Sequence, residues 1–210
     1  VRVDSAAGRS LEAIGVGEDV NAFLAPGFHL IAYPVKAGGA FNIVAFTSGQ
    51  LAVETWATTL DNAILKGAMG NTAPALSTLA DDGGEWTAWP IYSMQSGRWT
   101  SPSGIALVGD AAHAMPPYAA QGAAMAIEDA ETLAGHVVAQ PDNLPSALAR
   151  WEAERQKRIA QVSRRGSFNR LVWHAAGPIA VARHLALKLQ RPERLAASLD
   201  WLYGWKPPER

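Results

Sequence analysis

Two apolar runs, residues 28–35 and 41–47, stand out in the first half of the chain. Both are rich in β-branched or aromatic side chains, and residues 36–40 between them include two glycines that can supply positive φ at a turn. The pattern predicts an antiparallel hairpin. Alternation along the first strand places His29 and Tyr33 on the same face.

The segments around this hairpin have weaker patterns. Residues 1–27 are rich in glycine and alanine without clear periodicity, so we expect loop and short irregular pieces there. Residues 59–68 and 73–80 are predicted to be short helices. Residues 85–92 are tryptophan-rich and are predicted to be a strand.

The second half begins with a continuous apolar run, residues 105–108, flanked by turn residues. This is typical of a strand buried on both faces of a parallel sheet. Residues 109–110 form a Gly-Asp turn, a loop with a Pro-Pro pair follows, and residues 121–138 are predicted to be a helix. Strand, glycine turn and helix together indicate the ligand-binding edge of an α/β fold.

Helices are predicted for the rest of the chain. Asn143 can cap a long helix whose apolar residues recur at helical spacing, and we expect residues 177–178, Gly-Pro, to end it. Two further helices are predicted at residues 179–189 and 192–202. Four arginines of the long helix are predicted to lie on its solvated face: Arg155, Arg158, Arg164 and Arg165.

Composition narrows the possible classes of protein. The chain has 210 residues, 49% hydrophobic and 18% charged, which indicates a globular protein and not a disordered one. Eighteen basic and 19 acidic residues leave a net charge of -1, so neither nucleic acid nor a membrane is an expected partner. The absence of cysteine excludes disulfides, thiolate metal sites and a cysteine nucleophile. A cytoplasmic location is expected, because the sequence lacks both a leader pattern and a long apolar segment.

The chemistry is concentrated between residues 104 and 130. Asp110 follows the predicted buried strand, where ligands of open α/β sheets bind. The helix that starts near Gly122 has unpaired amides in its first turn, and a glycine there allows a ligand to approach the backbone. Because a helix start carries about half a positive charge, this end favours an electron-rich or anionic group.

The same stretch carries a resemblance to a known family. Its GDAAH sequence at residues 109–113, the Pro-Pro pair at 116–117, QGA at 121–123 and Ile-Glu-Asp-Ala at 127–130 match nearly letter for letter. The sequence resembles the single-component FAD-dependent aromatic hydroxylases, in particular the salicylate-hydroxylase-like group. Looser matches extend from about residue 28 to the end of the chain.

The resemblance implies an FAD-dependent monooxygenase that hydroxylates a small aromatic substrate with dioxygen and with NADH or NADPH as a transient co-substrate. It implies an α/β fold, or α+β for an isolated piece: part of a doubly wound FAD-binding fold, part of an antiparallel substrate-domain sheet, and C-terminal helices. Asp110 would bind the ribityl chain of FAD, and the backbone of residues 121–123 would lie under the pyrimidine edge of the flavin. The full set of implied cofactor-binding residues is Gly109, Asp110, Pro116, Gln121, Gly122 and Ala123.

Related hydroxybenzoate hydroxylases carry a histidine and a tyrosine with the spacing of His29 and Tyr33 in their substrate pocket, with the histidine acting as base. The resemblance therefore implies that His29 is the catalytic base and that Tyr33, Pro116 and Gln121 contact the substrate. A histidine can act as a base near neutral pH. A packed or solvent-edge role for His29 is the alternative.

Other polar residues are expected to be structural. His113 is assigned a loop-packing role, and no metal site is predicted because no third ligand accompanies it and Asp110. Glu128 and Asp129 lie inside a predicted helix and are expected to support a neighbouring segment. Residues 15–20 begin like a dinucleotide fingerprint but lack its third glycine and its strand and helix, so this hypothesis is rejected.

The family's G-x-G-x-x-G unit is therefore missing, and the chain is interpreted as the carboxyl-terminal portion of a flavin hydroxylase. Three parts are predicted: a partial substrate domain at residues 1–100, a flavin-contacting segment at 101–140, and a helical region at 141–210. Alone, the chain is expected to bind FAD weakly, to be inactive, and to associate with the missing amino-terminal half or with itself. A non-catalytic remnant acting as a binding or assembly module is one alternative, and a different FAD reaction on the same scaffold is another.

Overall fold

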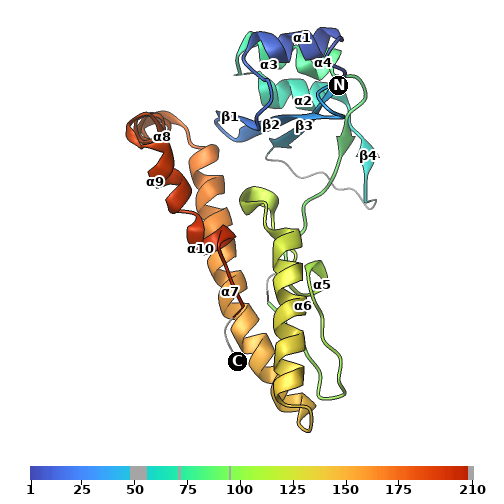
Figure 1. Cartoon of the computed structure of the whole chain (residues 1–210). Helices are drawn as coiled ribbons and strands as arrows, with labels where there is room; N and C mark the ends of the chain where they lie inside the picture. The colour runs from blue at the N-terminus through green and yellow to red at the C-terminus, as the bar shows by residue number, and fades with distance from the viewer. Residues whose placement is uncertain (48–55, 71, 95, 208–210) are drawn as a thin grey trace. The chain divides into compact units, whose positions relative to one another are not determined.

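A computed structural model describes residues 1–47, 56–70, 72–94 and 96–207 of the chain, whose helices and strands are labelled in Figure 1. The described residues form two compact units, which are treated separately below. The first unit contains Val1–Pro90 and Leu171–His184, and the second contains Ile91–Arg170 and Leu185–Arg210. The three-part division expected from the sequence stays a prediction.

The first unit is built on a three-stranded antiparallel sheet with the order β1-β2-β3. Its strands are β1 (Asn21–Ala25), β2 (Phe28–Val35) and β3 (Ala40–Thr47). The predicted hairpin is confirmed, with His29 opposite Phe46 and Tyr33 opposite Asn42. Positive φ at the turn falls on Lys36, Ala37 and Gly38, so a glycine supplies it at only one of three positions.

Four short helices cover one face of this sheet (Figure 1): α1 (Ala6–Ala13), α2 (Asn62–Met69), α3 (Pro74–Ser77) and α4 (Leu79–Asp82). Strand β2 provides the centre of the core. Its residues Phe28, Leu30 and Ala32 are fully buried against apolar side chains of the helices, as alternation predicts. The buried set includes Phe28, Leu30, Ala32, Leu11, Leu65, Met69, Leu76 and Leu79.

The prediction of loops over residues 1–27 is wrong, because that segment contains both α1 and β1. Helix α1 is capped by Ser5, whose Oγ accepts the Gly8 N–H at 3.0 Å. A Cβ at Gly8 would lie 2.2 Å from the carbonyl oxygen of Arg2, so glycine allows a very close approach of the chain. Tertiary packing of this kind stabilises a helix whose periodicity in the sequence is weak.

The strand expected at residues 85–92 is also largely wrong. Only β5 (Thr87–Ala88) forms, and it pairs with the equally short β4 (Thr58–Thr59). Trp89 beyond it is exposed. The tryptophan-rich composition favours a strand, but among the described residues this segment finds a partner over two positions only.

The second unit is dominated by two helices that lie side by side (Figure 1), α6 (Gly122–Ala139) and α7 (Leu144–Trp173). Shorter elements are α5 (Asp110–His113), the 3-10 turn η1 (Pro117–Ala119), α9 (Pro192–Ala197) and α10 (Asp200–Tyr203). The core between them is formed by Trp99, Ala112, Ala119, Met125, Trp151, Ile159, Val162 and Leu202. Within the described residues, every helix is too short or too polar to cross a membrane.

The buried strand predicted at residues 105–108 is not present. Ala106 makes a single bridge to Thr100, and the side chains of Ile105, Leu107 and Val108 are 59%, 39% and 40% exposed. An interior strand needs a hydrogen-bonding partner on each edge. Among the described residues this segment has one bridge, so its apolar side chains remain in contact with solvent.

The start of the long helix follows the prediction, but its end does not. The Ser146 N–H donates to Asn143 Oδ1 at 3.2 Å, which is the expected cap. Helix α7 ends at Trp173, whereas Gly177 and Pro178 begin α8 (Gly177–Leu189). A proline suits the first turn of a helix, because the amide it lacks has no partner there.

The alternation along β2 makes a direct prediction about stability. Leu30→Ala removes a fully buried side chain from the core, and we expect it to lower the free energy of unfolding by about 2–5 kcal/mol. Leu187→Ala is the matched control, because that leucine of α8 is exposed. Urea unfolding followed by circular dichroism would measure both. Equal effects of the two substitutions would contradict the assigned core.

Candidate functional site

The Gly-Asp turn at the start of α5 can be made only by glycine at its first position. Gly109 has φ 59° and ψ −141°, a region that side chains strongly disfavour. A Cβ there would also lie 3.1 Å from the Cβ of Ala126 on α6. The turn therefore packs directly against α6, and it sets the position of the next residue, Asp110.

Asp110 is exposed at the first position of α5, and its carboxylate lies beside the start of α6. A Cβ placed on Gly122 would be 3.9 Å from Asp110 Oδ1. Gly122 has no such atom, so the backbone of α6 is accessible next to an exposed carboxylate. The sequence placed both residues in one site, and the structure brings them together.

The first turn of α6 keeps its amides available in the described part of the chain. Gln121 occupies the cap position but makes no side-chain cap bond to the helix, and its side chain is buried. The amides of Gly122, Ala123 and Ala124 are those that a helix leaves without an internal acceptor. They give this end a partial positive charge.

Helix α7 holds the loop that leads into α6. Asn169 Nδ2 donates to the carbonyl oxygen of Tyr118 at 2.9 Å. Gly166 of α7 also faces this loop, because a Cβ there would be in van der Waals contact with Ala119, at 3.9 Å. Ala120 then adopts a left-handed conformation, φ 51° and ψ 37°, and turns the chain into Gln121. Pro116 precedes η1 in this loop.

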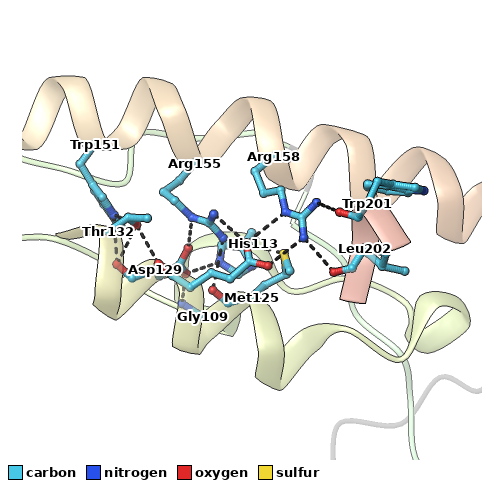
Figure 2. A network of polar contacts seen from close by, with 11 residues as sticks. Gly109, His113, Met125, Asp129, Thr132, Trp151, Arg155, Arg158, Trp201 and Leu202 are labelled. Atoms are coloured by element: carbon cyan, nitrogen blue, oxygen red, sulfur yellow. Dashed lines mark hydrogen bonds and ion pairs between the residues drawn. The ribbon is translucent and has the colours of Figure 1, made fainter. Parts of the chain in front are cut away.

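Behind the turn, the buried carboxylate of Asp129 on α6 joins several elements (Figure 2). Its Oδ2 accepts the Gly109 N–H at 2.9 Å and lies 2.5 Å from His113 Nε2. Its Oδ1 accepts Arg155 Nε–H at 2.7 Å. The backbone carbonyl of Asp129 accepts Trp151 Nε1–H at 3.1 Å. The expectation that Asp129 supports a neighbouring segment is therefore confirmed.

Glu128, the neighbour of Asp129, binds two arginines of α7 (Figure 2). Arg155 Nη1 donates to its Oε2 at 2.9 Å, and Arg158 donates Nε and Nη2 to its two oxygens at 3.0 and 2.8 Å. Arg158 also donates to the carbonyl oxygens of Trp201 and Leu202. The prediction that Arg155 and Arg158 lie on a solvated face is wrong, because both are buried in this cluster.

Burial and hydrogen bonding shift the pKa of Asp129 in opposite directions. Burial alone would raise the pKa of this carboxyl, because it disfavours the charged form. The hydrogen bonds from His113, the Gly109 amide and Arg155 outweigh burial and hold the pKa of Asp129 below its usual range. The carboxylate is therefore ionised at neutral pH and can accept all three bonds.

His113 has the packing role expected of it and also takes part in this network. Its side chain is 4% exposed, and its ring lies 5.3 Å from that of Trp99. Its Nδ1 is buried without a hydrogen-bond partner among the described residues. The residues described here contain no cluster of three or more side chains that could hold a metal.

His29 lies in the first unit, on β2. It is 1% exposed, its ring stacks on Phe46 at 4.2 Å, and its Nδ1 is 2.8 Å from Nε2 of His174. Burial, followed by the effect of His174, lowers the pKa of His29 to about 4. The ring is therefore neutral near pH 7, as a proton acceptor must be, but it is also the packed residue that the alternative interpretation described.

Tyr33 is on the same strand, four residues after His29 and on the same face. Its hydroxyl oxygen accepts Asn42 Nδ2–H at 2.8 Å. The two residues belong to the first unit, whereas Gly109, Asp110, Pro116 and Gln121–Ala123 belong to the second. The substrate-binding and base assignments stay predictions.

The sequence did not point to His174, Arg155 or Arg158 as part of a site. One signal for the arginines is present in the sequence: Glu128 and Asp129 directly follow the apolar first turns of α6, and buried carboxylates there need cations as partners. Spacing of Arg155 and Arg158 by three residues places both on one face of α7. For His174 the sequence offers no comparable signal.

The sequence profile described as the FAD binding domain matches residues 32–166 of the chain. The chain belongs to the FAD binding domain family. The family resemblance and the α/β fold class expected from residues 109–130 are thereby confirmed, and FAD is the cofactor of this family.

Named relatives agree with this assignment. The 3-hydroxybenzoate 6-hydroxylase of Polaromonas naphthalenivorans is 31% identical over 186 residues, which cover 87% of this chain and 46% of that protein. The 3-hydroxybenzoate 6-hydroxylase of Klebsiella oxytoca is 34% identical over 185 residues, with coverages of 86% and 46%. The chain spans about half the length of the curated relatives it matches.

Among solved structures, a salicylate hydroxylase substrate complex superposes with a TM-score of 0.78. It is 20% identical to this chain, and the match covers 98% of this chain and 52% of the other. At that level of identity the comparison shows a shared fold. The matched part of this chain includes residues of both units.

The residues at the turn fit an FAD molecule. An exposed carboxylate at Asp110 can accept hydrogen bonds from hydroxyl groups, and the uncapped amides of α6 can donate to an electron-rich ring edge. A Cβ on Gly122 would be in van der Waals contact with Asp110 Oδ1, at 3.9 Å, so glycine keeps the start of α6 open next to that carboxylate.

The buried network predicts a specific loss of stability. Asp129→Asn leaves Arg155 and His113 without their shared carboxylate, and we expect the free energy of unfolding to fall by about 3 kcal/mol. Asp142→Asn is the control, because Asp142 is exposed in the loop between α6 and α7. Chemical unfolding at neutral pH would measure both variants.

The pH dependence of unfolding provides the second readout for the same variant. Because the pKa of Asp129 is lowered by folding, its contribution is fully present above the unfolded value of about 3.9 and is lost as the pH falls through the native value. The unmodified chain should lose more stability in acid than the Asp129→Asn variant. Parallel acid profiles would show that the carboxylate is not the stabilising group.

Proposed function

We propose that this chain forms the flavin-contacting portion of an FAD-dependent aromatic monooxygenase. The observation that carries the proposal is the exposed carboxylate of Asp110 beside the glycine start of α6. The proposed cofactor-binding residues are Gly109, Asp110, Pro116, Gln121, Gly122 and Ala123. FAD supplies the oxygen-transfer chemistry when bound, so the protein needs neither a nucleophile nor a metal of its own.

The residues of the chain have separate proposed roles at this site. Asp110 accepts hydrogen bonds from the ribityl hydroxyl groups and fixes the position of the cofactor. The amides of Gly122 and Ala123 donate toward the pyrimidine edge of the flavin and favour negative charge there. Gly109 contributes no side chain, and this lets α5 and α6 approach each other behind the ligand.

We propose a small phenol as the substrate class and NADH or NADPH as the co-substrate. The relatives named above act on 3-hydroxybenzoate, and the solved structure is of a salicylate hydroxylase. His29 is the proposed base for the phenol proton, with Tyr33, Pro116 and Gln121 as further substrate contacts. The neutral state of His29 near pH 7 supports this role. A cytoplasmic location belongs to the same proposal.

The proposed partner of the chain is the dinucleotide-binding half of such a monooxygenase. Ile105, Leu107 and Val108 support this, because they form an exposed apolar segment immediately before the Gly-Asp turn. A strand added along this segment would cover it and satisfy its backbone groups. The alternative function, a non-catalytic binding or assembly module, would use the same segment.

The cofactor contact is tested in a flavin-loaded protein that contains this chain. Asp110→Ala removes a charged hydrogen-bond acceptor, and we expect FAD affinity to fall by roughly ten- to a hundredfold. Flavin fluorescence titration measures the affinity, with Asp142→Ala as the surface control. For His113→Ala we expect a lower free energy of unfolding and a smaller loss of FAD affinity than for Asp110→Ala. Equal FAD losses in the two folded variants would refute the assignment of Asp110.

The open segment is tested on the 210-residue chain alone. We expect self-association, negligible monooxygenase activity and weak FAD binding. Ile105→Lys should shift the chain toward monomer, because a charge on an exposed strand opposes pairing. Val138→Lys, a change at an isolated residue that is 78% exposed, is the control. Gel filtration measures self-association, and the visible spectrum measures bound flavin. A monomer with stoichiometric flavin would overturn the proposal.

A further inference from the structure

The carboxyl end of α7 contributes a second histidine to the surroundings of His29. Nε2 of His174 lies 2.8 Å from Nδ1 of His29, which is within hydrogen-bonding distance. The ring of Trp173 meets His29 edge-on, with 5.0 Å between centroids, and the ring of Phe46 stacks on His29 with 4.2 Å between centroids. Among the described residues, these two rings and the hydrogen bond to His174 restrict the orientation of the buried imidazole.

Backbone contacts hold His174 in this position. The Gly27 N–H, in the turn between β1 and β2, donates to the carbonyl oxygen of His174 at 3.2 Å. Arg183 Nη1 donates to the carbonyl oxygens of Val172 and Trp173, both at 2.9 Å. The last turn of α7 is therefore attached to the sheet and to α8. His174 itself is only partly buried.

A single buried histidine is a poor final acceptor for a phenol proton. A phenol has a pKa of about 10 in water, whereas burial lowers the pKa of His29 to about 4. A proton placed on His29 alone would return to the phenolate, because the charged ring is poorly solvated. The charge becomes tolerable when the proton moves on to a more exposed group.

We infer that His174 is a positioning residue that holds His29 with its Nδ1 protonated, and that it receives this proton when His29 accepts another at Nε2. The inference rests on the proposed function. In the step, the phenol O–H bond breaks and an Nε2–H bond forms on His29, while the Nδ1 proton of His29 passes to Nε2 of His174. His174 then releases its own Nδ1 proton to water, so protons and charge balance.

The first test uses the unmodified 210-residue chain and long-range ¹H–¹⁵N NMR of its imidazole rings. At neutral pH we expect His29 to carry its proton on Nδ1 and His174 to have an unprotonated Nε2. The opposite pair of tautomers would overturn the inference, because Nε2 of His29 would then already be occupied.

The second test measures exchange of the His29 ring proton with water. In His174→Gln, the amide oxygen can still accept the His29 bond but cannot carry a proton onward. We expect exchange to slow by roughly a hundredfold, the lower end of what a positioned proton-transfer group contributes. His136→Gln is the control, since His136 lies on α6 in the second unit and pairs with Glu154. Equal exchange rates in His174→Gln and the unmodified chain would overturn the relay.

Neither measurement needs FAD or substrate. Failure of FAD binding in the Asp110 experiment would refute the proposed function and leave the NMR result standing. A wrong tautomer or an unchanged exchange rate would refute the role of His174 and leave the flavin site intact. If His174→Gln does not fold, as judged from the β2–β3 amide spectrum, the tautomers of the unmodified chain still decide.

Discussion

The carboxylate of Asp129 is the group on which the candidate flavin site depends. Its two oxygens bind the Gly109 amide, His113 and Arg155, so a single negative charge joins the turn, α5, α6 and α7. An unpaired charge at this depth would be very costly. The turn therefore keeps its conformation only while both helices are in place, and the exposed Asp110 gains its position from a network that it does not touch.

The sequence predicted those parts of the fold that local pattern determines. The apolar runs predicted β2 with its observed bounds and β3 to within one residue, and the sequence also predicted α6 and the start of α7. The predictions from local sequence pattern were wrong where an element depends on contacts with distant parts of the chain. The apolar run at residues 105–108 has the composition of an interior strand, but a strand is defined by its neighbours, and the described residues supply one bridge. Similarly, α1 is stabilised by a backbone approach at Gly8 that periodicity does not register.

The candidate site was predictable to a similar degree. The sequence predicts Gly109, Asp110 and Gly122 as parts of one site because their chemistry is local to one short motif, and the structure places Asp110 beside Gly122. Arg155 was misassigned, because arginine is usually exposed and its buried partner lies on a different helix. His174 was missed because its contact with His29 spans 145 residues of sequence. No motif encodes such a pair, which forms only when the end of α7 is attached to the sheet.

The pairing of Glu128 with Arg158 limits which residues homologous sequences can have at these two positions. Arg158 uses its fork of nitrogens for one carboxylate and two backbone carbonyls, a geometry that lysine cannot reproduce. Loss of Glu128 leaves Arg158 buried without a carboxylate partner, whereas loss of Arg158 leaves Glu128 paired with Arg155. Across homologous sequences, an arginine at position 158 should therefore be accompanied by an acidic residue at position 128.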